Sequence, residues 1–234
     1  MGRGARVRGR LAYHAVIDLM RRREVDGATA FLGVDGTSHG TRQRARFLGR
    51  NAGVPVSVVA VGSANTIAPT LPELGVLLER PLLLLERVRV CKVAGARLAT
   101  PTELPDTDPS GLPLWQKLMI HAPEYARHQG RPVYTELIRR LREAGAPGAT
   151  ALRGFWGYHG DQQPHGDGLF APRRRVPVVV SIIDTPERPR DWFHIVDDAT
   201  TESGLVTNEM VPAARVASSG RGASVLRPAI GPTE

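Results

Sequence analysis

The chain has 234 residues, which is enough for one or two domains that each bury a hydrophobic core. Its one cysteine, Cys91, excludes an internal disulfide framework and cysteine-rich zinc modules, and it favours a reducing compartment. The net charge is +8, and residues 1–50 supply most of it, with eleven arginines against four acidic residues. Because no aromatic stacking platform is interleaved with these arginines, we do not expect nucleic acid as a partner.

No segment of the sequence has the pattern of a membrane span or a secretion signal. None of its apolar runs approaches the roughly 18 residues that a span requires. Near the N-terminus, Asp18 and the three arginines that begin at Arg21 interrupt what would be the apolar core of a signal peptide. We therefore expect a cytoplasmic protein.

The chain contains an internal repeat. At a shift of 121 residues, positions 9–36 and 130–157 carry the same residue at 11 of 28 places, without a gap. At a shift of 122, the Val-Pro-Val of residues 54–56 falls on that of residues 176–178. This agreement indicates two homologous domains in one chain.

The repeat divides the chain into four parts. We expect the two domains at residues 1–92 and 114–216. Between them, residues 93–113 carry four prolines among Thr, Asp, Ser and Gly, which is the composition of a linker. Residues 217–234 show no hydrophobic periodicity and are predicted to form a disordered tail.

In the first domain we predict a helix followed by three strands. The apolar face of the helix is formed by Tyr13, Val16, Ile17 and Met20. The strands are predicted at residues 28–32, 54–61 and 82–90. By the repeat, the opening strand of this domain should lie before residue 1, and residues 1–8 are too few, and too rich in glycine and arginine, to replace it. Two explanations are open: the start is assigned too late, or the domain is degraded.

The second domain shows the same elements in full. We predict strands at residues 115–121, 149–153, 176–184 and 205–211. A helix with Val133, Leu137 and Leu141 on one face follows the first strand, a glycine-rich loop at residues 154–175 follows the second, and another helix follows the third. The order strand, helix, strand, strand, helix, strand predicts an α+β fold of two tandem ferredoxin-like domains, the first lacking its opening strand.

Several motifs of the second domain resemble those of one bacterial family. They are residues 130–134 (Gly-Arg-Pro-Val-Tyr), residues 148–154 (Gly-Ala-Thr-Ala-Leu-Arg-Gly), Gly157 with Tyr158, His165, and residues 177–179 (Pro-Val-Val) with Asp184. Together they resemble the family called domain of unknown function 190, or uncharacterised protein family 0166, a branch of the PII-like superfamily. The repeat extends this likeness to the first domain, so the chain looks like a tandem version of the family.

The resemblance implies a regulatory protein rather than an enzyme. PII-like proteins are usually trimeric and bind small effectors, often adenine nucleotides, in clefts between subunits. The loop between their second and third strands contacts a target, often a membrane transporter or channel. By this resemblance we expect a homo-oligomer of trimer-like assembly whose effector loop is residues 154–175. A purely structural assembly module is an open alternative.

The predicted ligand-binding residues lie where the second strand meets this loop: Arg153, Gly154, Gly157 and Tyr158. The guanidinium group of Arg153 and free backbone amides of the glycines can bind a phosphate group. The other interpretation is that the glycines only permit the turn out of the strand. The first domain has Leu32 in the place of Arg153, so a matching site there should be weaker.

The same loop holds a doubled His-Gly-Asp triplet with four candidate metal ligands: His159, Asp161, His165 and Asp167. Two imidazoles and two carboxylates can bind a divalent metal such as Zn²⁺ or Ni²⁺, so a metal-binding protein of the same fold is the alternative function. The competing interpretation is a polar effector loop without metal.

Overall fold

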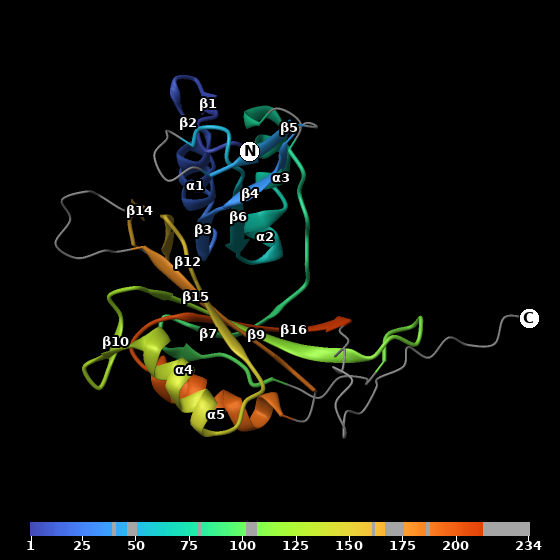
Figure 1. Ribbon diagram of the computed structural model, residues 1–234, viewed down its shortest axis with the longest axis vertical. Coiled ribbons are helices and arrows are strands. Elements are labelled where there is room, and N and C mark those ends of the chain that lie inside the picture. The colour runs from blue at the N-terminus through green and yellow to red at the C-terminus, as the bar shows by residue number, and fades with distance from the viewer. Residues whose placement is uncertain are drawn as a thin grey trace, which may run out of the picture.

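The computed structural model describes residues 1–38, 41–45, 51–78, 81–101, 107–160, 162–166, 176–185 and 188–212. The predicted tail at 217–234 lies outside these residues, as do parts of the predicted linker and effector loop. In Figure 1 the first half of the chain lies above a six-stranded sheet, and two long helices lie below it. None of the helices within the described ranges is long and apolar enough to cross a membrane.

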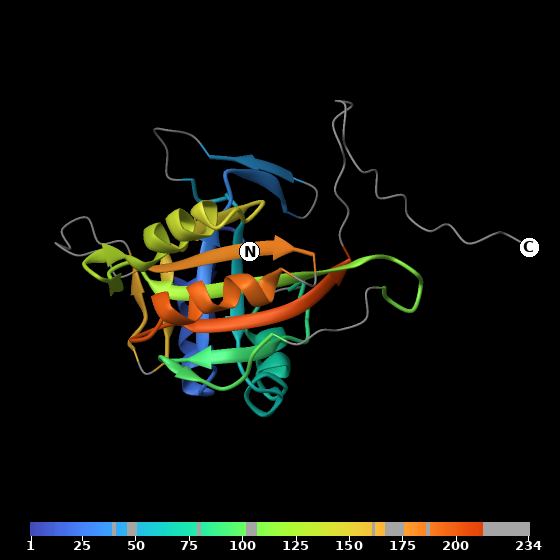
Figure 2. The same cartoon turned by 90° about the horizontal axis from the view of Figure 1, so that it is seen from below.

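The second half supplies four consecutive strands of that sheet, from one edge inward, and the two helices. The strands are β9 (Leu114–Pro123), β12 (Ala149–Arg153), β15 (Pro177–Asp184) and β16 (Leu205–Pro212). They pair antiparallel in the order β12-β15-β9-β16. Both helices, α4 (Val133–Glu143) and α5 (Pro189–Ala199), cover one face of the sheet (Figure 2). This is the ferredoxin-like arrangement that the sequence predicts, and it is confirmed.

The core of this half lies between the sheet and the two helices. Apolar residues repeat at every second position of the strands and every third or fourth position of the helices, so each element turns one apolar face inward. Leu118 and Ile120 of β9 pack there with Leu137 of α4 and Val196 of α5. Val179, on the opposite face of β15, is also buried, because the first half of the chain covers that face.

Equivalent elements at the start of the two halves lie at a constant spacing in the sequence. Its elements are β1 (Arg6–Val7), β2 (Arg10–Leu11), α1 (Ala12–Arg22), β3 (Gly27–Leu32), β4 (Asp35–Ser38), β5 (Thr41–Arg44), β6 (Val56–Val61), α2 (Ala64–Ile67) and α3 (Thr70–Leu77). The hairpin of β10 (Arg127–His128) and β11 (Arg131–Pro132) lies 121 residues after that of β1 and β2, and α4 begins 121 residues after α1. The shift found in the sequence is therefore the shift between equivalent elements of the structure.

The two halves exchange strands. β13 (Trp156–His159) leaves the second half and pairs with β3, which gives the sheet of the first half the order β14-β13-β3-β6 with β14 (His165–Gly166) at its edge. In return, β7 (Arg89–Val93) pairs with β16 and brings β8 (Ala96–Arg97) to the edge of the six-stranded sheet. Part of the predicted 154–175 loop is therefore strand that joins the two halves.

In the described first half, residues 1–2 lie where the end of the opening strand lies in the second half. Gly2 forms an isolated bridge with Pro55, in the place where Pro123 of β9 pairs with Pro177 of β15 in the second half. The backbone N–H of Val56 donates to the carbonyl oxygen of Met1 at 2.7 Å. Beyond this point no strand of the described chain pairs with the outer edge of β6.

The predicted strand at residues 82–90 is wrong over most of its length, because pairing begins only at Arg89. Residues 82–87, here called the leucine segment, form no strand, and the residues Leu82 and Leu84 are 98% and 81% exposed. In the second half, the equivalent strand β16 pairs with the opening strand β9. The described first half offers no such neighbour, and the β propensity of a leucine-rich run does not form a strand alone.

Candidate functional site

The predicted ligand residues lie where the chain crosses from the six-stranded sheet to the sheet of the first half. Arg153 ends β12, and Gly154 and Phe155 lead into β13. The backbone N–H of Gly154 donates to the carbonyl oxygen of Pro177 at 2.8 Å, and that of Phe155 donates to Ala30 at 2.9 Å. The amide of Gly154, predicted as a phosphate donor, is thus used inside the fold.

Gly154 and Gly157 allow β13 to approach β3 closely. A Cβ atom at Gly154 would overlap the side chain of Thr29, and one at Gly157 would overlap the carbonyl oxygen of Ala28. Only a residue without a side chain fits at these two positions. The geometry therefore gives the glycines a packing role, and their role in ligand binding stays a prediction.

Tyr158 is buried in the first half of the chain. Its hydroxyl donates to the carbonyl oxygen of Val25 at 2.8 Å, and the guanidinium carbon of Arg21 lies 5.7 Å from the centre of its ring. Burial raises the pKa of the phenol above its ordinary value, and the nearby Arg21 opposes that shift. The hydroxyl thus anchors β13 to the turn between α1 and β3.

Arg153 is the predicted ligand residue whose side chain stays accessible. It is 46% exposed and forms an ion pair with Glu124, in the turn that follows β9. Arg127 donates to the carbonyl oxygen of Glu124 at 3.1 Å. The hydroxyl of Tyr125, which follows Glu124 in the chain, accepts a hydrogen bond from the side-chain amide of Gln162 at 2.8 Å. Arg153, this turn and the start of the loop after β13 therefore form one connected polar group.

The candidate metal ligands are not gathered by the described structure. His159 is buried against His121 of β9, with ring centroids 5.8 Å apart, whereas His165 lies on the edge strand β14. Asp161 and Asp167 lie outside the described residues. Within those residues no group of three or more His, Cys, Asp or Glu side chains could hold a metal ion. The metal alternative stays a prediction.

Burial depresses the basicity of both histidines. Burial lowers the pKa of His121 to about 4, and burial together with the neighbouring His121 lowers the pKa of His159 to about 3. Nε2 of His121 and both ring nitrogens of His159 have no hydrogen-bond partner among the described residues. The two rings are therefore neutral at physiological pH and lie between the two sheets.

One cavity was not predicted from the sequence. It has a volume of about 580 Å³ and is lined by Arg97, Thr100, Pro101, Phe193, His194, Asp197, Asp198 and Thr201. Its acidic groups are already paired: Asp197 binds Lys92 and Arg97, and Asp198 binds Arg140. Because the cavity forms from α5 and the segment after β8, which belong to different halves, no local sequence signal could have shown it.

Comparison with known proteins is consistent with the repeat. The profile of the family DUF190, described as an uncharacterised conserved region, matches residues 1–90 and again residues 115–213. A relative from Aquifex aeolicus (strain VF5), named UPF0166 protein, is 34% identical over 94 residues, which is 40% of this chain and 88% of the relative.

Proposed function

The chain belongs to the DUF190 family through both of its halves, and on this premise we propose that it is a non-enzymatic, PII-like regulatory protein. It binds a small anionic effector at the crossing from β12 to β13, and an adenine nucleotide is the effector to test first. The observation that carries this proposal is the position of Arg153, half exposed and held by a single carboxylate, where the two halves meet.

In this proposal the effector replaces Glu124 as the ion-pair partner of Arg153. A phosphate group offers Arg153 a charge-assisted, bidentate partner that competes with the carboxylate. The Arg153 side of this pair is accessible, with 46% of its side chain exposed against 13% for Glu124, so a multiply charged anion can reach the guanidinium and compete with the carboxylate. The anion then has Arg127 and the hydroxyl of Tyr125 within the same turn.

The exchange is transmitted through the turn that holds Glu124. Tyr125 in this turn binds Gln162, which follows β13 in the predicted effector loop. Release of Glu124 from Arg153 frees the turn to move and changes its contact with the loop. In this proposal the protein is cytoplasmic, works as a homo-oligomer of trimer-like assembly, and contacts a membrane transporter or channel through residues 154–175.

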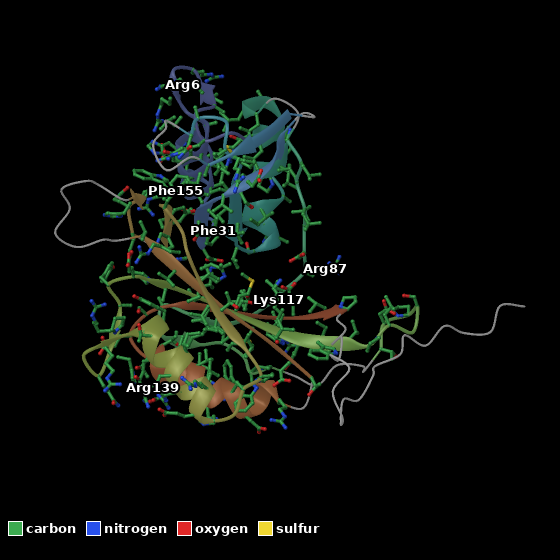
Figure 3. All side chains as sticks on the ribbon, in the orientation of Figure 1. Arg6, Phe31, Arg87, Lys117, Arg139 and Phe155 are labelled. Atoms are coloured by element: carbon green, nitrogen blue, oxygen red, sulfur yellow. The ribbon has the colours of Figure 1, made fainter. Side chains whose placement is uncertain are left out.

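Isothermal titration calorimetry with ATP, ADP, AMP and inorganic phosphate tests the proposal. The variant Arg153→Ala should bind the preferred nucleotide about tenfold more weakly, since one charge-assisted bond of about 1.4 kcal/mol is a factor of ten. Arg139→Ala is the matched control, because Arg139 is also ion-paired and 41% exposed but lies on α4 (Figure 3). Failure of every nucleotide to bind, or an equal loss in both variants, would refute the proposal.

A further inference from the structure

We propose that β4 of the first half pairs with the outer edge of β12 in a second copy of this chain. Within one chain, β13 leaves the second half and pairs with β3 of the first half. At the shift of 121 residues, β4 is the counterpart of β13, and β12 is the counterpart of β3. The proposed contact is therefore the contact between the two halves, made once more between two chains.

The chain leaves β3 and β12 in the same way. The backbone N–H of Gly33 donates to the carbonyl oxygen of Pro55 at 2.8 Å, and that of Gly154 donates to Pro177 at 2.8 Å. After this bond β4 forms a hairpin with β5, as β13 does with β14. Whereas β13 also pairs with β3, β4 pairs with β5 alone among the described residues. In Figure 2 this hairpin (blue) lies at the margin of the molecule.

The strand edge that fits β4 is that of β12. One side of β12 pairs with β15, and no strand of the described chain pairs with its other side. Its counterpart β3 lies between β13 and β6, and Ala28, Thr29 and Ala30 of β3 are buried. The equivalent residues 149–151 of β12 are half-buried or exposed. An open edge of this kind is a template for the addition of a strand.

The backbone groups of both strands point in the direction that the pairing needs. In an antiparallel ladder, the backbone groups of alternate residues point to the same neighbour. The N–H of Gly154 points to β15, so the backbone groups of Ala151 point away from β15. The carbonyl oxygen of Val34 accepts a hydrogen bond from Ala45, the residue after β5, so the backbone groups of Thr37 point away from β5.

The contact within the chain also supplies the register of the proposed contact. Trp156 of β13 pairs with Ala30 of β3 in an antiparallel ladder. A shift of both residues by 121 positions puts Asp35 of one copy opposite Ala151 of the other. Both positions are exposed in the single chain, so a second copy can reach them.

Exposed apolar side chains lie where this contact would cover them. Phe155, labelled in Figure 3, packs edge to face on Tyr13 of α1, with ring centroids 4.9 Å apart. Its counterpart Val34 is 78% exposed, and the counterpart of Tyr13 is Tyr134 on α4. Leu152, which the register places opposite Val34, is 50% exposed. Pairing would bury these apolar groups against one another, which favours a second copy of this chain as the occupant.

This inference deepens the proposed function, because it gives the proposed homo-oligomer its interface. Each copy donates one β4 and accepts another at its β12, so the contact joins unlike surfaces and closes into a ring of copies. The tests below use no effector. Their failure can therefore be distinguished from a failure of nucleotide binding at Arg153.

Disulfide cross-linking between single-cysteine variants tests the register. The native Cys91 is fully buried, so Asp35→Cys and Ala151→Cys each add one accessible thiol. Residues opposite each other in a ladder have Cα atoms about 5.5 Å apart, which a disulfide can span. When the two variants are co-expressed and oxidised, non-reducing electrophoresis should show a covalent dimer, and neither variant should form it alone. Leu152→Cys in place of Ala151→Cys is the matched control, because it turns the thiol to the opposite face and should abolish the cross-link.

A proline on the open edge provides the second arm. Ala151→Pro removes an N–H that points outward but no hydrogen bond to β15. In sedimentation velocity at micromolar concentration the native chain should form an oligomer. The variant should associate about tenfold more weakly or worse, with an unchanged far-UV circular dichroism spectrum. A native chain that stays monomeric, an assembly that Ala151→Pro leaves intact, or a dimer that forms as readily through Leu152→Cys would overturn the inference.

Discussion

The imidazole rings of His121 and His159 meet edge to face across the boundary between the two sheets, with their centroids 5.8 Å apart. His121 belongs to β9 of the second half, and His159 to β13, which has joined the first half. The contact lies where strand exchange brings the halves together. A charge on either ring would be buried between the two sheets.

Stability should therefore fall in mild acid. The folded-state pKa values, about 4 for His121 and about 3 for His159, lie below the ordinary value of 6.5. The unfolded chain thus binds more protons below pH 6.5, so the stability present above that pH is lost as the pH falls toward 4. At pH 5 the loss should be about 2 kcal/mol for each histidine. Urea unfolding at pH 7.5, 6 and 5 measures it.

A double variant isolates this effect from that of the carboxylates. His121→Leu with His159→Leu removes both titrating rings and fills the space with apolar groups, which leaves no unpaired nitrogen. The free energy of unfolding of this variant should change much less between pH 7.5 and 5 than that of the native chain. Equal slopes in the two proteins would show that the histidines are protonated without cost in the folded state.

The close approach of β13 to β3 should make Gly157 intolerant of any side chain. Gly157→Ala forces a Cβ atom against the carbonyl oxygen of Ala28, and such overpacking costs about 1–3 kcal/mol. Gly148→Ala is the control, because a Cβ atom there meets nothing within 4 Å. Chemical denaturation of the two variants should differ accordingly, and an unchanged midpoint for Gly157→Ala would refute the packing role.

Removal of the competing carboxylate should strengthen effector binding. Glu124→Gln keeps the shape of the side chain but releases Arg153 from its ion pair. The affinity for the preferred nucleotide should rise about two- to fivefold, which corresponds to the loss of a weak competing ion pair of roughly 0.4–1 kcal/mol. Calorimetric titration of this variant beside Arg153→Ala checks the prediction, and a loss of affinity would mean that Glu124 itself holds the effector.

The elements that could be predicted from the sequence are those fixed by local pattern and by the repeat. The helices α1 and α4 follow from apolar spacing, and α4 and the strand β12 also from glycines at their ends. The pairing of β13 with β3 could not be predicted, because it depends on which strand edges remain open after the helices have packed. The leucine segment failed as a predicted strand for the same reason, since its propensity had no neighbour to pair with.

The site residues also divide into those that could be predicted from the sequence and those that could not. Arg153 could be identified because a charged residue next to a glycine at a strand end is visible in the sequence. The buried contacts of Tyr158 with Val25 and of His159 with His121 join residues that lie far apart in the chain. No local spacing encodes such contacts, so both side chains were expected in the loop.

Hydrogen–deuterium exchange with and without saturating ATP tests most directly the claim that an effector at Arg153 acts on the loop. The account predicts altered exchange in peptides that cover residues 122–127 and 150–166, and the change should disappear in Arg153→Ala. A change confined to residues 97–101 and 193–201, around the cavity beside α5, would contradict the account, and so would no change at all.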